Sequence, residues 1–185
     1  IRPNERIHGI FTDGGEKPNI VPARAAMDWY VRATDGVHLD RLKPRVLAAL
    51  RAGAEATGCE FEHRWHDPAY DDLVRNEPLE ELYAANSESL GRPVGEPGRD
   101  GDVVGSTDMG NVSHVVPSIH PMVAIAPPGV GIHTAGFTEH AASTAGDDGV
   151  LLGAAAMALT VVDLWTRPDV LAACRAAFDA ELQRR

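Results

Sequence analysis

Two stretches of alternating polarity near the start of the chain, separated by turn-forming residues, constrain the fold more than any other feature. The first is RIHGIFT (6–12) and the second is IVPARAAMDWYVRA (20–33). Between them, DGGEKPN (13–19) holds two glycines, a proline and an asparagine, which favour a turn. Apolar side chains occupy alternate positions of the second stretch and would share one face of a strand: Val21, Ala23, Ala25, Met27, Trp29 and Val31. The pattern predicts a β-hairpin with one apolar face.

A helix and a further strand are predicted after this hairpin. Apolar residues recur at three- and four-residue spacing over 40–57, with Pro44 in the first turns and Gly58 as a stop. CEFEHRWH (59–66) alternates again, so residues 5–66 have the order β-β-α-β. A ferredoxin-like layer, β-α-β-β-α-β, has this order as its last two thirds. We therefore expect the natural domain to begin upstream of Ile1, or its missing part to come from another chain.

The second part of the chain is predicted to be mainly helical. Helices are expected over 77–91 and 148–165 and from 167 onward, with a Gly- and Pro-rich loop over 92–106 and a short buried strand over 122–126. The apolar stretch 150–165 is interrupted by Asp163 and is interpreted as a buried helix rather than a membrane span. The predicted fold class is mixed α/β (α+β), with a partial domain over 1–75 and a second portion over 76–185.

Composition excludes some classes of function. The chain has 185 residues, a net charge of −10 and no cluster of Lys and Arg, which argues against nucleic acid as a partner. Its two cysteines, Cys59 and Cys174, lie far apart in the sequence, and IRPNERIHG (1–9) lacks the apolar stretch of a signal peptide. The sequence therefore predicts a protein of the reducing cytoplasm that binds neither nucleic acid nor a membrane.

Three motifs in combination resemble a known family of enzymes. They are HGIFTDGGEKPNIVPARAAMDWYVRA (8–33), GSTDMGNVSHVVPSIHP (105–121) and GIHTAGFTEHAAS (131–143). These motifs are similar to segments of the zinc-dependent aminoacylase and glutamate carboxypeptidase family of metallopeptidases. Within that family they look like the amidohydrolase branch of p-aminobenzoyl-glutamate hydrolase and the β-alanyl-lysine-type dipeptidases. The resemblance covers nearly the whole chain and the second part of the family's length.

The resemblance implies a two-metal catalytic domain with an inserted lid that forms homodimers. Residues 1–75 would be part of this lid, or dimerisation layer, and 76–185 the C-terminal portion of the catalytic domain. The implied cofactor is a pair of zinc ions, with manganese or cobalt as alternatives. Most ligands and the glutamate general base would lie before Ile1, so no catalytic residue is expected here. In the family the last ligand is a histidine between a glycine-containing loop and a helix, and His133 matches that position. A neutral imidazole at such a position suits zinc. The alternative is that His133 caps or hydrogen-bonds its own loop.

The resemblance also implies two substrate contacts in the lid. Asn19, in NIVP, matches an asparagine that contacts substrate, often across the dimer, and Arg32 matches an arginine that reaches the substrate carboxylate. An amide and a guanidinium both suit a carboxylate, and the guanidinium can bind it bidentately. Two alternatives stay open, a turn residue for Asn19 and a solvated charge for Arg32. Simple alternation puts the two positions on opposite faces of one strand, so a bulge would be needed.

The central motif supplies further candidates. Asp108 precedes a predicted short helix, DMGNVSHVV, and we favour helix capping as its main role. His114 would line the substrate site or pack beneath it. His120, before a predicted buried strand, would orient a neighbouring metal ligand or contact substrate. His140, seven residues after His133, is expected near a helix start in a structural role.

The predicted function is a metal-dependent amidohydrolase or peptidase that cleaves an amide bond in an N-acyl amino acid or dipeptide-like substrate. This chain alone is expected to be inactive. The alternative is a non-catalytic dimerisation or binding module, from a truncated or degenerate homologue. The resemblance implies homodimers through the edge of the lid sheet, with contributions from helix 40–57 and strand 20–33. An exposed sheet edge invites pairing, which supports a partner there.

Overall fold

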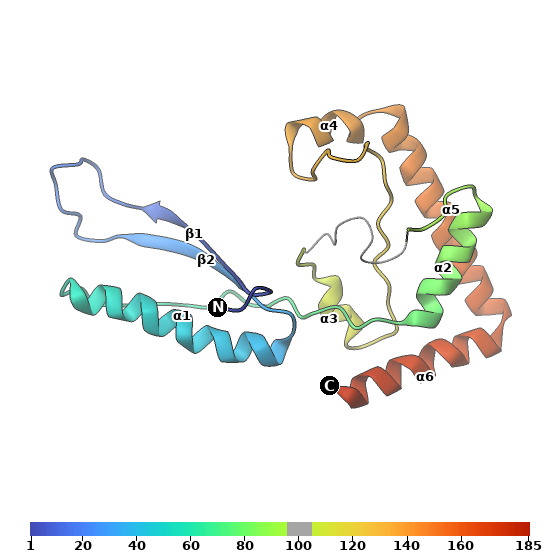
Figure 1. Ribbon diagram of the computed structural model, residues 1–185, viewed down its shortest axis with the longest axis horizontal. Helices are drawn as coiled ribbons and strands as arrows, with labels where there is room; N and C mark the ends of the chain where they lie inside the picture. The colour runs from blue at the N-terminus through green and yellow to red at the C-terminus, as the bar shows by residue number, and fades with distance from the viewer. Residues whose placement is uncertain (96–104) are drawn as a thin grey trace. The chain divides into compact units, whose positions relative to one another are not determined.

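A computed structural model describes residues 1–95 and 105–185, which form two compact units, Ile1–Asp72 and Leu73–Arg185 (Figure 1). The first unit holds a two-stranded antiparallel sheet and one long helix, and the second holds the other helices. The mixed α/β class predicted from the sequence is therefore confirmed. The loop predicted over 92–106 lies largely outside the described residues, since the structure does not describe 96–104.

The predicted hairpin is present, with a shorter second strand. β1 (Arg6–Asp13) pairs with β2 (Ala26–Arg32), and the register irregularity lies between Phe11 and Asp13. Residues 20–25, predicted as strand, belong instead to the exposed loop at the end of the hairpin (Figure 1). Pro22 has no N–H to donate to a ladder, and it packs against Gly15, whose φ of 95° suits glycine. The loop therefore folds back on itself before pairing begins.

One face of the hairpin packs against the helix of the same unit. Trp29 is half-buried, and its ring covers Gly9 so closely that a Cβ there would lie 2.5 Å from ring carbons. Leu42 and Val46 from α1 (Gly36–Ala56) are buried, and with Trp29 they line an apolar hollow on the helix side. The alternation predicted for the second strand is thus confirmed over its paired residues, with Asp28 and Tyr30 exposed between the inward side chains.

The helix α1 begins four residues before the predicted start at 40. Asp35 caps it, because its carboxylate accepts a hydrogen bond of 2.8 Å from the backbone N–H of His38. Pro44 consequently lies in the helix interior rather than in the first turns, where it removes the bond to the Asp40 carbonyl. The predicted stop is confirmed, since Gly58 adopts a φ of 69° just after the last turn.

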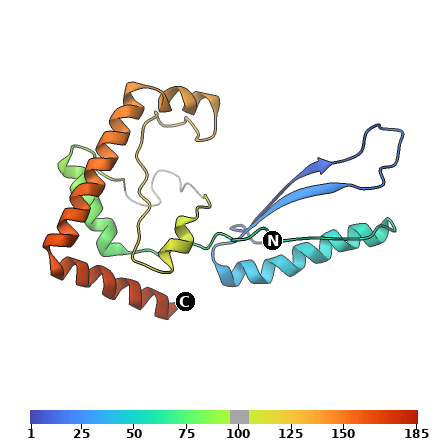
Figure 2. The same ribbon diagram turned by 180° about the vertical axis from the view of Figure 1, so that it is seen from behind.

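The strand predicted over 59–66 is not formed. This segment is extended and runs back along α1, without a strand partner among the described residues (Figure 2). Arg51 lies over the ring of Phe61 at 5.4 Å, and Lys43 lies over the ring of Trp65 at 5.8 Å. The alternation of the segment is real, but its aromatic side contacts helix cations instead of entering a sheet.

In the second unit, three long helices pack together: α2 (Glu77–Ser89), α5 (Thr144–Thr166) and α6 (Pro168–Arg184). Asn76, 1% exposed, ties two of them, because its amide nitrogen donates to the Cys174 carbonyl at 2.8 Å and its oxygen caps α2 at Leu79. The shorter helices are α3 (Met109–Ser113) and α4 (Ala135–Ala141). The buried Ser113 hydroxyl accepts the N–H of Val74 at 2.8 Å, which holds α3 to the segment before α2.

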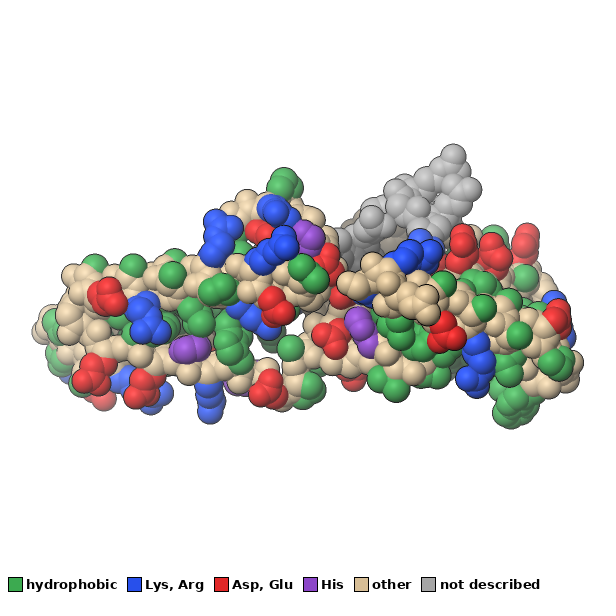
Figure 3. Space-filling model, turned by 90° about the horizontal axis from the view of Figure 1, so that it is seen from below, with side chains coloured by type: hydrophobic (Ala, Val, Ile, Leu, Met, Phe, Trp, Pro, Cys, Tyr) green, Lys and Arg blue, Asp and Glu red, His purple; other side chains and the backbone are tan. Residues whose placement is uncertain are grey.

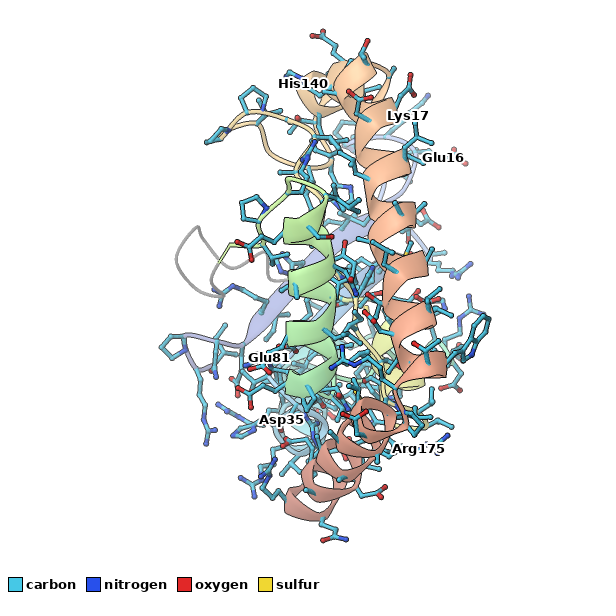
Figure 4. All side chains as sticks on the ribbon, turned by 90° about the vertical axis from the view of Figure 1, so that its right-hand side faces the viewer. Glu16, Lys17, Asp35, Glu81, His140 and Arg175 are labelled. Carbon is cyan, nitrogen blue, oxygen red and sulfur yellow. The ribbon has the colours of Figure 1, made fainter. Side chains whose placement is uncertain are left out.

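Two predictions for this unit are wrong. Residues 122–126 are extended but unpaired within the described chain, and only their alternate side chains, Val123 and Ile125, turn toward α5. A Cβ at Gly149 of α5 would lie 2.4 Å from Ile125, so the approach requires glycine. The helix α5 is buried on this side but not all round, since Trp165 is 80% exposed. Figure 4 shows α5 beside α2, and Figure 3 shows hydrophobic side chains on the surface.

By length and composition, α5 alone among the described helices could cross a membrane, with 22% of its most apolar window buried. The helix has 23 residues and extends beyond the apolar stretch 150–165 at both ends. Its N-terminus is capped by Ser143, and Asn86 of α2 bonds Asp163 near its other end at 2.9 Å. The Asn86 bond joins α5 to α2.

Candidate functional site

His133 occupies a backbone position that is unusual for any residue other than glycine. Its φ is 64°, and it is the only non-glycine residue with a positive φ in the part of the chain that the structure describes. A side chain in this left-handed region costs roughly 1–2 kcal/mol. Such strain persists where the surrounding structure enforces it, and it gathers at functional sites. The backbone conformation therefore makes His133 a candidate functional residue.

The sequence around His133 explains its placement. A turn at 127–130 precedes it, closed by the Val130 N–H bonded to the Pro127 carbonyl at 3.2 Å. Directly after it, the hydroxyl of Thr134 accepts the N–H of Phe137 at 3.2 Å and so caps α4. The same hydroxyl donates to the Gly131 carbonyl at 2.8 Å. His133 is thus held between a turn and a helix N-terminus.

The imidazole of His133 is exposed, and no hydrogen bond or ion pair of its side chain is seen among the described residues. The alternative role, in which His133 caps or hydrogen-bonds its loop, is filled by Thr134 instead. The role of metal ligand stays a prediction. An exposed imidazole, oriented by a strained backbone and without a competing partner in the described chain, is suited to it.

The other histidines of the two motifs lie in different settings. His114 is half-buried at the C-terminal cap of α3, and His120 is exposed in the extended segment that follows. His140 belongs to the last turn of α4 rather than to a helix start, and its carbonyl accepts the Ser143 hydroxyl at 2.7 Å (Figure 4). The described residues contain no group of three or more His, Cys, Asp or Glu side chains that could hold a metal ion. By themselves they do not fit a metal centre.

Asp108 does not perform the capping role that was favoured for it. It occupies the position before α3, but its backbone is helical, with φ −64° and ψ −15°, and its carboxylate accepts no capping hydrogen bond. A capping residue is normally extended, which turns its side chain toward the free N–H groups. The Thr107 hydroxyl accepts the N–H of Met109 at 3.3 Å instead.

The structure does not bring Asn19 and Arg32 together within one chain. Asn19 lies in the turn closed by the Ile20 N–H bonded to the Lys17 carbonyl at 3.1 Å, in the loop at one end of the hairpin. Arg32 is the last residue of β2, at the other end. The seven residues of β2 span roughly 20 Å at the usual rise of a strand. One small carboxylate therefore cannot contact both residues of the same chain.

Arg32 has an environment that the sequence did not reveal. Its Nε is buried without a hydrogen-bond partner among the described residues, and its guanidinium lies over the Tyr30 ring at 5.4 Å. The residue paired with it across the hairpin is Arg6, so both side chains stand on one face. Sequence reasoning missed Arg6. Counting the hairpin register back from Arg32 would have found it.

Two groups that lie away from these residues have shifted pKa values. The backbone N–H and the ring of His38 bond the Asp35 carboxylate and hold the pKa of that carboxyl below its ordinary value. Burial raises the pKa of the Cys174 thiol in the second unit. Both shifts have structural causes, a helix cap and a packed core.

Comparison with known proteins relates the chain to two enzymes. A dipeptidase of Mus musculus, named Xaa-Arg dipeptidase, is 37% identical over 186 aligned residues, and the human protein of the same name is 35% identical over 184. Each alignment covers 99% of this chain. The chain is homologous to dipeptidases. It spans 42% of the length of each relative. No family model matches the chain.

This homology supports the peptidase family that the three motifs resemble. It reaches the strained loop of His133 and both ends of the hairpin, because the alignments run over nearly the whole chain. The branch of the family, the metal and the subunit arrangement go beyond what the two names state.

Proposed function

We propose that the whole protein carrying this chain is a metal-dependent hydrolase that cleaves the amide bond of a dipeptide or an N-acyl amino acid. The observation that carries the proposal is the homology to two dipeptidases along nearly the entire chain. The name of these relatives, Xaa-Arg dipeptidase, makes a dipeptide with C-terminal arginine the first substrate to test. In this proposal residues 1–75 belong to a lid and 76–185 to the C-terminal portion of the catalytic domain, in the amidohydrolase branch.

His133 is the proposed metal ligand in this chain. Its left-handed backbone and its exposed imidazole, free of a hydrogen bond in the described residues, support the role. Zinc is the proposed metal, since it accepts imidazole nitrogen readily. The described residues supply no further donor set, so the other ligands and the general base would come from elsewhere in the whole protein. The isolated chain would then neither hold zinc nor hydrolyse amides, and His114 and His120 would only border the substrate.

A homodimer is proposed because the two expected carboxylate contacts lie at opposite ends of one hairpin. Two chains related by a two-fold axis can bring Asn19 of one copy to Arg32 of the other, twice in each dimer. The exposed apolar residues of the hairpin favour a covering partner: Ile10, Phe11, Ile20, Val21 and Tyr30. A cytoplasmic location is proposed with it, since both cysteines are free thiols.

The hydrolase proposal is tested with the whole protein on a panel of substrates. We expect hydrolysis of glycyl-arginine, with release of free arginine followed by an amine assay, and loss of activity after a chelator. Zinc content is measured on the same preparation and on the 185-residue chain. Failure to hydrolyse any dipeptide or acylated amino acid, with metal bound and the fold intact, would leave the alternative of a non-catalytic binding module.

The shared site is tested by mixing two inactive variants. Asn19→Ala and Arg32→Gln are expected each to abolish activity as pure dimers. When subunits exchange, half of the dimers hold one of each chain, and one of their two sites is intact, so about a quarter of full activity returns. If mixing restores nothing while exchange is demonstrated by tagged subunits, the two residues do not share a site across the dimer.

A further inference from the structure

The open face of the hairpin carries an arginine pair that the predicted contacts do not account for. Arg6 and Arg32 are directly opposite in the register, and the next pair on the same face is His8 with Tyr30. The other face, with Ile7 and Trp29, lines the apolar hollow beneath α1. Like charges placed directly across a strand pair destabilise it. A counter-charge between them would remove that cost.

No side chain of the described unit supplies this counter-charge. Neither Arg6 nor Arg32 takes part in an ion pair there. The Glu5 carboxylate, 6% exposed, accepts the backbone N–H of Arg2 at 2.7 Å. Asp28 shares the face, but it lies four residues from Arg32, roughly 13 Å along the strand. Arg6 and Arg32 therefore occupy opposed positions of β1 and β2, and neither has an ion-pair partner among the described residues.

The donors that remain on this pair fit an oxyanion. Arg32 keeps a buried Nε with no acceptor among the described residues, while its guanidinium rests against the ring of Tyr30. The Arg6 side chain is restrained, because one of its terminal nitrogens donates to the carbonyls of Pro3 and Glu5. Its second terminal nitrogen makes no such bond. The terminal nitrogens of the two guanidinium groups that have no acceptor among the described residues are donors of the kind that bind a carboxylate.

We propose that Arg6 is a second binding residue for the carboxylate of the substrate, placed beside Arg32 by the hairpin register. The proposal rests on the proposed function for the identity of the ligand, which is the C-terminal carboxylate of a dipeptide or acylated amino acid. In this proposal Arg6 and Arg32 each donate to one carboxylate, and the contact with the Tyr30 ring restrains the Arg32 side chain. Binding of the carboxylate at this pair would fix the position of the substrate amide relative to the hairpin.

The test is a binding measurement on the whole protein, by calorimetry, with free arginine and argininamide as probes. They differ in the carboxylate alone. Arg6→Gln is expected to weaken binding of free arginine roughly tenfold or more and to leave argininamide unchanged, because a charge-assisted hydrogen bond is lost. Arg6→Lys should bind free arginine more tightly than Arg6→Gln, since lysine keeps the positive charge but lacks the paired N–H donors of a guanidinium. Arg24→Gln, an exposed arginine in the loop of the same hairpin, is the matched control and should change neither.

Equal weakening of both probes by Arg6→Gln would overturn the proposal, because a residue that only supports the fold does not distinguish a carboxylate from an amide. Unchanged affinity for free arginine, or no carboxylate-dependent binding to the unaltered protein, would overturn it as well. The outcome is separable from the proposed function. A protein that binds free arginine through Arg6 yet hydrolyses no amide would retain this site and lose the hydrolase assignment.

Discussion

Replacing His133 by glycine separates the two properties of this residue, its backbone conformation and its imidazole. The present φ of 64° costs a side chain roughly 1–2 kcal/mol, and glycine escapes that cost. Glycine also loses roughly 0.5–1 kcal/mol more conformational entropy on folding. The expected net change for His133→Gly is therefore a gain of roughly 0–1.5 kcal/mol in the free energy of unfolding. The imidazole is exposed and no hydrogen bond of its side chain is seen in the described chain, so removing it breaks no such bond.

The matched variant is His133→Ala, which loses the imidazole but keeps a Cβ in the left-handed region. Urea denaturation of the whole protein should show the glycine variant to be more stable than the alanine variant. Hydrolysis of glycyl-arginine should fall by more than roughly a hundredfold in both, since even residues that only orient a ligand are worth up to that much. A glycine variant less stable than the alanine variant would refute the strain argument. Full activity in either variant would refute the assignment of His133 as a ligand.

Three further outcomes are expected from the fold. Asp35→Ala should cost about 1 kcal/mol by uncapping α1. His38 lowers the pKa of Asp35, so the ionised carboxylate stabilises the fold fully above the ordinary carboxyl pKa. This stabilisation is lost as the pH falls through the lowered pKa. The free energy of unfolding should therefore change less with pH, in the acid range, in Asp35→Ala than in the unaltered protein. Gly149→Ala should lower the free energy of unfolding by roughly 1–3 kcal/mol, measured by urea denaturation, because the added methyl group would clash with Ile125. Gly53→Ala, where the added methyl group of α1 meets open space, should raise it by roughly 0.5–1 kcal/mol.

Local chemistry explains which parts of the hairpin and helix could be predicted. Alternation located both strands, and Gly58 located the helix end, because each depends on neighbours in sequence. The start of β2 was placed six residues early, since alternation over 20–25 continues through Pro22, which cannot donate to a ladder. The segment 59–66 alternates equally well, but a strand needs a partner, and the pattern carries no information on whether one is present.

In the candidate site, too, residue types could be predicted from the sequence, whereas backbone conformation and cross-strand pairing could not. The motif identified His133 through its residue type and its loop, but its φ depends on how the turn at 127–130 meets the cap of α4. Asp108 was assigned as a cap from its residue type, and its helical backbone excludes that role. Arg6 was missed because a single arginine in a strand has no signal of its own. It becomes notable only when the register places it opposite Arg32.

The helix α5 shows what an apolar pattern does and does not report. A helix that is apolar on all sides requires cover on all sides, and the apolar stretch 150–165 was predicted to be a buried helix. Gly149 and Ala156 meet it on the side where the unit packs, while Leu151 and Trp165 remain exposed. Each large apolar side chain left in water forgoes roughly 1.5–3 kcal/mol of burial. The apolar sequence of α5 predicts that the helix is covered on all sides. In the structure the unit 73–185 covers one side of it. The prediction of a helix is therefore correct, and the prediction of its burial holds for one side.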